Sequence, residues 1–225
     1  MKNSESQPHL DIIRQKLLPL VIKDAAFEGW TSDVLARATE SADLHPGAVE
    51  LALPRGCTDL IRFWAGYNDK AMLEAWEKAK PENMRIRDRA IFLVQTRIET
   101  IGEENKEAAL RAVTRLTLPD QAGEALKLGW RTADIMWTAM GDTSTDYNYY
   151  TKRMILSGVF ASTLMVWLQN DDDTAWKFLD RRIGNVMQFE GLKARFRKTT
   201  ASWPDPAGLL GKLRYGRGRA RARRM

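Results

Sequence analysis

Apolar residues recur every three or four positions along almost the whole chain, and no stretch alternates with a period of two for long enough to predict a strand. Three- and four-residue spacing places apolar side chains on one face of a helix. The fold class that we predict is all-α, a helical bundle. We expect residues 1–80 and 81–191 to form one fold unit and residues 192–225 to form a separate tail.

Helix boundaries follow from glycine, proline and capping residues between the apolar segments. Gly29 ends the first predicted helix, Thr31 caps the second, and Pro46 opens a short third one. The predicted helices cover residues 10–27, 31–42, 46–53, 58–79, 84–101, 104–116, 121–140, 145–170 and 173–189. The helix after Ser144 carries apolar residues on all sides, which predicts a central place in the bundle.

The short third helix and its neighbours have the spacing of a helix-turn-helix, as in tetracycline-repressor-like regulators. Residues 1–60 hold six basic and nine acidic residues, a net charge of −3, and the predicted recognition helix 46–53 contains Glu50 but no lysine or arginine. Because phosphate contacts require cations, we expect no specific DNA binding by this segment. A ligand-responsive transcriptional regulator remains the alternative function.

The tail has a different charge from the rest of the chain. Residues 192–225 hold eleven basic residues and one acid, a net of +10, so the chain's total of +6 leaves −4 for residues 1–191. Basic residues around an apolar stripe are typical of a helix that lies on an anionic membrane surface. A solvated basic end is the alternative. The predicted membrane-binding residues are Phe189, Leu192, Lys193, Arg195, Phe196, Arg197, Lys198, Trp203, Leu209, Leu210 and Leu213.

Residues that would indicate catalysis are sparse. The two histidines, His9 and His45, lack the Glu-x-x-His spacing of di-iron bundles, and no glycine-rich phosphate loop or nucleophile elbow occurs. The single cysteine, Cys57, is read as a buried structural residue rather than a nucleophile. We therefore expect no enzyme activity, no metal site and no cofactor.

The segment from Gly141 to Arg153 is rich in tyrosine. Tyr147, Tyr149 and Tyr150 point in three directions around one helical turn, so at least one of them is expected at the surface. Exposed tyrosines beside charged residues are typical of protein interfaces. Tyrosine is also tolerated half-exposed at the start of a helix, and the sequence leaves these two readings open.

Four segments together resemble a known family. They are 29–31, 53–68, 141–153 and 176–183. They are similar to the ubiquinone-biosynthesis accessory family whose mitochondrial member is the ninth Coq protein, and the resemblance covers about residues 10–190. It implies a tetracycline-repressor-like fold without regulatory DNA binding. It also implies a non-catalytic protein that encloses an isoprenoid lipid, a quinone or its precursor, and presents it to the di-iron demethoxyubiquinone hydroxylase.

The resemblance also implies sites and a location. The docking surface for the hydroxylase corresponds to Asp146, Tyr149, Tyr150 and Arg153, although the family commonly has tryptophan in place of Tyr149. The expected lipid-binding residues are Trp137, Met140, Leu156, Phe160, Leu164 and Trp167, with ordinary core packing as the alternative. Because the start of the chain lacks an import signal, we expect a bacterial, cytoplasmic protein, peripheral on the inner face of the cell membrane. A homodimer stays open.

Overall fold

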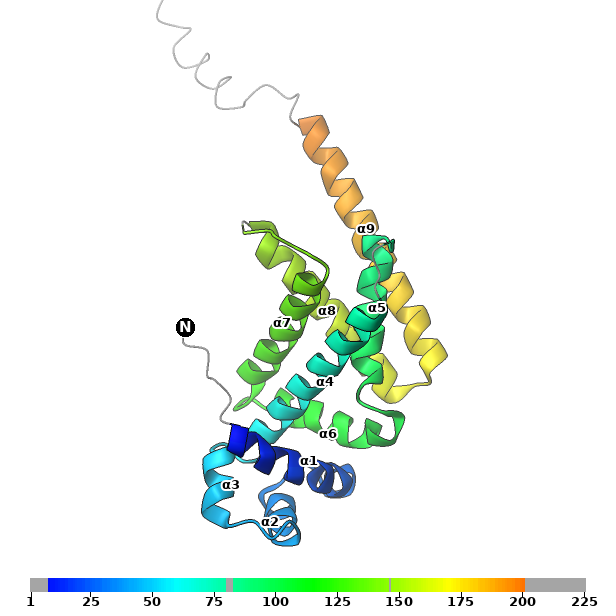
Figure 1. The fold of residues 1–225 in the computed structure, drawn as a ribbon. Coiled ribbons are helices and arrows are strands. Elements are labelled where there is room, and N and C mark those ends of the chain that lie inside the picture. Colours follow the sequence, from blue (N-terminus) through cyan, green and yellow to red (C-terminus); the bar gives the residue numbers. More distant parts are fainter. Residues whose placement is uncertain (1–7, 80–82, 146, 201–225) are drawn as a thin grey trace, which may run out of the picture. The chain divides into compact units, whose positions relative to one another are not determined.

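The computed structural model describes residues 8–79, 83–145 and 147–200, and the side chains of residues 8, 122 and 188–200 lie outside this description. The described chain is all-α, as predicted (Figure 1). Its elements are α1 (Pro8–Glu28), α2 (Ser32–Ser41), α3 (Pro46–Ala52), α4 (Cys57–Ala79), α5 (Ile86–Glu99), the 3₁₀ turn η1 (Glu103–Asn105), α6 (Lys106–Thr117), α7 (Ala122–Ala139), α8 (Tyr147–Gln169) and α9 (Asp172–Thr200).

Most boundaries agree with the sequence prediction, and the local reasons are visible. Gly29 ends α1 with a φ of 81°, and the Thr31 hydroxyl accepts a hydrogen bond from the Val34 amide at 3.3 Å as the N-cap of α2. One predicted helix, 104–116, is shorter than expected because it is preceded by η1. Gly102 has a φ of 83°, and its carbonyl accepts a hydrogen bond from the Asn105 amide that closes this tight turn.

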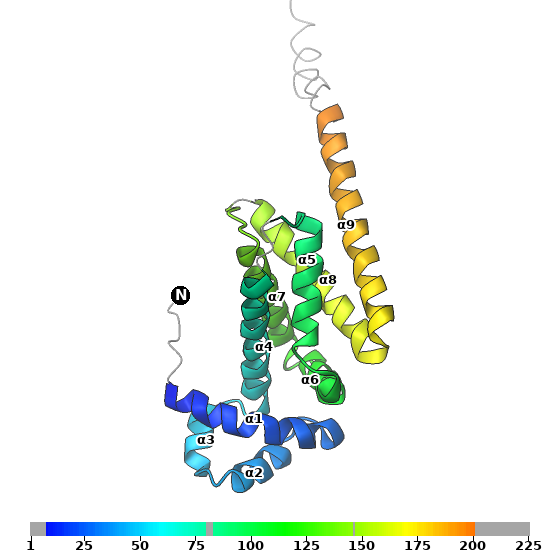
Figure 2. The ribbon, with the colours of Figure 1, turned by 45° about the vertical axis from the view of Figure 1, so that its right-hand side comes forward.

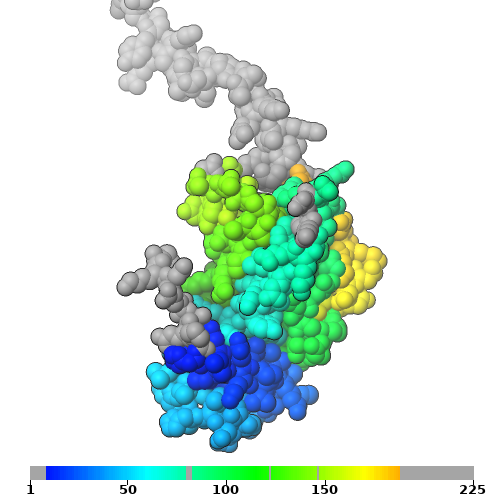
Figure 3. All heavy atoms as spheres, viewed as in Figure 1, coloured from blue at the N-terminus to red at the C-terminus, as the bar shows by residue number. Residues whose placement is uncertain are grey.

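The chain divides into two compact units, residues 1–183 and 184–225. Within the first unit, α1, α2 and α3 lie together at one end, and α4 leads from that end toward α5, α7 and α8 (Figures 1 and 2). Figure 3 shows the side chains of α7 packed beside those of α4 on one face of this unit. The core is formed by fully buried apolar residues that include Leu17, Leu60, Met136 and Leu179.

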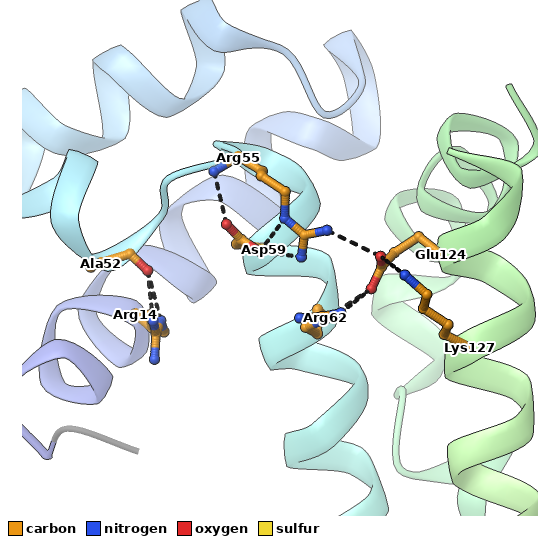
Figure 4. A network of polar contacts seen from close by, with 7 residues as sticks. All are labelled: Arg14, Ala52, Arg55, Asp59, Arg62, Glu124 and Lys127. Atoms are coloured by element: carbon orange, nitrogen blue, oxygen red, sulfur yellow. Dashed lines mark hydrogen bonds and ion pairs between the residues drawn. The ribbon is translucent and has the colours of Figure 1, made fainter. Parts of the chain in front are cut away.

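An ion-pair network connects α4 to α7 (Figure 4). Arg55, in the turn before α4, donates to Asp59 Oδ1 at 2.9 Å through Nε and to Glu124 Oε2 at 3.0 Å through Nη1. Arg62 also donates to the nearly buried Glu124 carboxylate. Burial opposes ionisation of Glu124, but the hydrogen bonds from Arg55 and Arg62 outweigh it and lower the pKa of Glu124. This network holds the turn before α4 and the start of α4 against α7.

The predicted central position of α8 needs a correction. Leu156, Val159, Phe160 and Trp167 are buried, but Met154 is 66% exposed, so one side of the helix faces solvent. Because methionine occurs on both buried and exposed faces, its hydropathy alone does not show which side of an apolar helix is covered. No helix within the described ranges has the length and apolar character needed to cross a bilayer.

Candidate functional site

A cavity of about 340 Å³ lies among α4, α5, α6, α7 and α8. Its walls are mainly apolar, and α4, α6, α7 and α8 supply most of them. The lining residues are Ile61, Trp64, Ala65, Asn68, Arg97, Ile101, Ala109, Ala112, Val113, Leu116, Thr117, Ala125, Leu128, Gly129, Thr132, Phe160, Ala161, Leu164 and Met165. This volume is at the lower end of the roughly 300–1,000 Å³ found for small-molecule pockets.

A buried ion pair borders the cavity. Arg97, only 4% exposed, donates through Nε to Asp69 Oδ1 at 2.6 Å and through Nη2 to the Ala65 carbonyl at 3.1 Å. The Thr132 hydroxyl donates to the same Asp69 oxygen at 3.0 Å. The Arg97 guanidinium also lies 5.5 Å from the centre of the Phe160 ring. The cavity therefore combines apolar walls with a charged, hydrogen-bonded border.

Two of the six residues expected to bind lipid, Phe160 and Leu164, line this cavity. Trp137, Met140, Leu156 and Trp167 are not among its lining residues. Trp137 Nε1 instead donates to the Lys152 carbonyl at 3.0 Å, and Trp167 Nε1 donates to Asp172 Oδ1 at 2.7 Å. The sequence did not predict the lining residues on α4 and α6. Periodicity shows which face of a helix is buried, but it does not show where packed helices leave a cavity between them.

Aromatic and apolar side chains gather on the outside of α7 and α8. The Trp130 ring lies 6.4 Å from Tyr149 and 6.1 Å from Tyr150, and the two tyrosine rings are 5.1 Å apart in an edge-to-face arrangement. Tyr150 is 58% exposed, and Leu126 and Met154 lie on the same two helices with even more exposure. We call Leu126, Trp130, Tyr149, Tyr150 and Met154 the α7–α8 aromatic surface. Exposed apolar patches of this kind mark interaction sites.

Arg153 lies beneath this surface and is 2% exposed. It donates to Asp134 Oδ1 at 2.5 Å and to Asp142 Oδ2 at 3.0 Å, and its guanidinium carbon lies 3.5 Å from the centre of the Tyr149 ring. Arg153 therefore supports the Tyr149 ring from inside the fold, and its expected place at the docking surface stays a prediction. Asp146, the fourth residue expected at the docking surface, lies outside the described residues.

Asp142 accepts two further hydrogen bonds, from Lys152 at 2.6 Å and from Ser144 at 2.8 Å. Burial opposes its ionisation, but these bonds and the one from Arg153 together lower the pKa of Asp142 to about 2. The carboxylate is thus charged at any physiological pH, and it fixes the start of α8 under the aromatic surface.

Comparison with known proteins shows that the chain is similar to one family. Residues 122–190, which include α7 and α8 with the aromatic surface, match the COQ9 family. The mitochondrial ubiquinone biosynthesis protein COQ9 of Xenopus tropicalis is 28% identical over 199 residues, which cover 83% of this chain and 61% of that protein. Over most of its length, the chain is similar to COQ9 proteins.

Other COQ9 proteins are similarly related. The rat protein is 29% identical over 189 residues, which cover 78% of this chain and 59% of its own length, and the human protein is 27% identical over 189 residues, with 78% and 58% covered. The chain thus spans about 60% of the length of these mitochondrial ubiquinone biosynthesis proteins.

Two further expectations concern residues outside the cavity. Cys57 is buried, as predicted, and its thiol donates to the Thr31 carbonyl at 3.1 Å. Burial raises the pKa of this thiol to about 11, so the reactive thiolate is disfavoured. The predicted membrane-binding residues from Phe189 to Lys198 lie on α9, but their side chains, and the whole of residues 201–225, are outside the described part.

Proposed function

We propose that the chain is a non-catalytic accessory protein of ubiquinone biosynthesis that binds an isoprenoid quinone or precursor in the α4–α8 cavity. The observation that carries this proposal is the apolar cavity with its buried polar border, in a chain that is similar to COQ9 proteins. The curated relatives are named as ubiquinone biosynthesis proteins. The arrangement of α1–α4 is consistent with a tetracycline-repressor-like architecture, which we propose as the fold type.

The size of the cavity limits how the lipid is held. A volume of about 340 Å³ suits a substituted ring with its first prenyl units but is too small for a long polyprenyl chain. The rest of the isoprenoid therefore lies outside the cavity, along the apolar surface of the protein or in a membrane. Such partial enclosure suits a protein that presents the ring of a lipid while the lipid's tail remains membrane-associated.

The α7–α8 aromatic surface is the proposed docking site for the di-iron demethoxyubiquinone hydroxylase. Tyrosine and tryptophan supply large contact areas with few rotatable bonds, and interfaces are enriched in them. Truncating one central aromatic side chain can cost about 2 kcal/mol, or roughly thirtyfold in affinity. Tyr150→Ala should therefore reduce hydroxylase pull-down strongly, whereas Phe27→Ala, which removes another exposed ring on α1, should not. Equal pull-down by both variants would refute this docking site.

The basic tail is the proposed contact with the inner face of the cell membrane. Deleting residues 192–225 changes the net charge from +6 to −4 and removes most of the apolar stripe that begins at Phe189. Binding to vesicles that contain anionic lipid should fall, and binding of the full chain should weaken with added salt. Unchanged sedimentation of the truncated chain with vesicles at low salt would exclude the tail as the anchor.

The lipid-binding proposal is tested by organic extraction and mass spectrometry after incubation with quinone-loaded liposomes. We expect the purified chain to retain an isoprenoid quinone and to show no turnover on its own. Leu164→Trp, which fills part of the cavity, should reduce retention, and Leu126→Trp at an exposed position of α7 is the matched control. Failure of the unmodified chain to retain any isoprenoid would overturn the proposal.

A tetracycline-repressor-like regulator is the second candidate, because the short helices α2 and α3 both pack against α1. The exposed Glu50 on α3 and the −3 charge of residues 1–60 argue against DNA contact there. Sequence-specific DNA binding by a chain that ends at Gly191, which lacks the basic tail, would favour the regulator.

A further inference from the structure

Asn68 lines the cavity and has an amide oxygen without a partner among the described residues. It lies on α4 one turn after Trp64, lines the cavity and is only 3% exposed. Its side-chain oxygen Oδ1 is buried and has no hydrogen-bond partner in the described part of the chain. Buried polar atoms in folded proteins are nearly always hydrogen-bonded. An unpaired oxygen on a residue that lines a cavity therefore points to a bound ligand that donates the missing hydrogen bond.

The other polar side chains at the cavity differ from Asn68 because each has a partner. Thr132 donates to Asp69, and the Thr117 hydroxyl donates to the Thr114 carbonyl at 2.7 Å. Arg97 is held by Asp69 and the Ala65 carbonyl. The protein therefore completes its own network around Asp69, whereas the Asn68 amide oxygen has no donor among the described residues.

We infer that Asn68 is a specificity-determining residue, whose amide oxygen accepts a hydrogen bond from a ring hydroxyl of the bound lipid. This inference rests on the proposed lipid-binding function and adds to it the chemistry of the head group. An amide oxygen is only an acceptor, so it favours a ring that donates a hydroxyl hydrogen, such as a phenol or a hydroquinone, over a quinone ring that carries ethers and carbonyls alone. The apolar walls then contact the ring face and the first prenyl units.

The energetic consequence is selectivity rather than tight binding. A ligand without a donor leaves Oδ1 buried and unpaired, and sites built to bond a polar group discriminate strongly against analogues that lack it. We expect a preference of about tenfold for a hydroxylated ring, because a hydrogen bond to an otherwise unpaired buried acceptor contributes about that factor.

A two-by-two binding experiment on the full chain tests this inference. The probes are farnesylphenol and farnesylbenzene, which differ only in the hydroxyl, and the chains are the unmodified protein and Asn68→Leu, which keeps the side-chain branching but removes both polar atoms. Affinities are measured by tryptophan fluorescence, since Trp64 lines the cavity. The ratio of the two affinities, compared between the two chains, cancels the different water solubilities of the probes.

Thr163→Val is the matched control. Thr163 carries the second buried side-chain oxygen without a partner in the described residues, but it does not line the cavity. Both variants remove an unpaired buried polar atom, so neither should lower the melting temperature of the ligand-free chain. Only Asn68→Leu should change selectivity between the probes.

The expected result is a preference for farnesylphenol that falls at least fivefold in Asn68→Leu and is unchanged in Thr163→Val. Equal ratios in all three chains would overturn the inference while leaving lipid binding intact, and would indicate that water pairs with Asn68. Loss of selectivity in Thr163→Val as well would also overturn it, because the effect would then not belong to the cavity wall. Failure of the unmodified chain to bind either probe would overturn the proposed function itself.

Discussion

Arg97 and Arg153 are both nearly fully buried, and both pair with aspartate near an aromatic ring, yet they lie in different surroundings. Arg97, on α5, borders the cavity and has one carboxylate partner, Asp69. Arg153, on α8, lies under the α7–α8 aromatic surface and has two carboxylate partners, Asp134 and Asp142. The first pair organises the border of a cavity and the second supports an exposed surface.

Because their surroundings differ, we expect removal of Arg97 to destabilise the protein more than removal of Arg153. Without Arg97, the buried Asp69 keeps the Thr132 hydroxyl, and its nearest other cation is Arg131 at 3.8 Å. Without Arg153, Asp142 keeps Lys152 at 2.6 Å, and Asp134 is exposed enough to be hydrated. A buried charge that loses its partner is strongly destabilising, so the two sites should separate in a stability measurement.

The largest effect is expected for Arg97→Met. Leaving Asp69 buried with only a hydroxyl and a distant cation should lower the free energy of unfolding by about 3–5 kcal/mol. For a domain of this size that corresponds to a fall in melting temperature of roughly 6–20 °C. Thermal and urea unfolding provide the measurement. The double variant Arg97→Met/Asp69→Leu is the control, and it should recover much of the loss because no buried charge remains.

Arg153→Met should cost less, about 2–3 kcal/mol, because Lys152 still pairs with Asp142. A matched control is Arg87→Met, which breaks the exposed pair with Asp180 and should change stability by less than about 1 kcal/mol. A cost for Arg153→Met as large as that for Arg97→Met would show that Lys152 does not compensate, and would break the contrast between the two sites.

The next largest effect that we expect is a loss of stability in acid, caused by protonation of Asp142. Its folded-state pKa of about 2 is below the ordinary value of 3.8, so its contribution to stability is complete above about pH 4 and is lost as the pH falls toward 2. The contribution is about 2 kcal/mol. Urea unfolding of the unmodified chain and of Asp142→Asn should therefore show a stability gap that narrows between pH 4 and pH 2. A constant gap across that range would contradict the low pKa.

The smallest effect on stability is expected for Tyr150→Ala. Its ring is more than half exposed, so truncation should lower the free energy of unfolding by less than about 1 kcal/mol. Tyr149 makes the closer contact with Arg153, so Tyr149→Ala should cost more in the same unfolding experiment. If Tyr150→Ala proved the more destabilising of the two, Tyr150 would belong to the core and the exposed aromatic surface would need redefinition.

The sequence by itself determined the helical class, most helix boundaries and the buried state of Cys57. These features depend on local signals, such as apolar spacing, the Thr31 cap and the glycines at 29 and 141, each of which has a positive φ. The tyrosine cluster was also recognisable, because three tyrosines around one turn cannot all face one side.

The tertiary structure alone decided which residues meet across the bundle. Only Phe160 and Leu164 of the six expected lipid contacts line the cavity, while Trp64 and Asn68 come from a helix far earlier in the chain. The partners of Arg153 likewise lie on α7 and in the loop that follows it. A sequence pattern reports the periodicity of one helix, whereas a cavity or a buried ion pair depends on the angle and distance at which several helices pack.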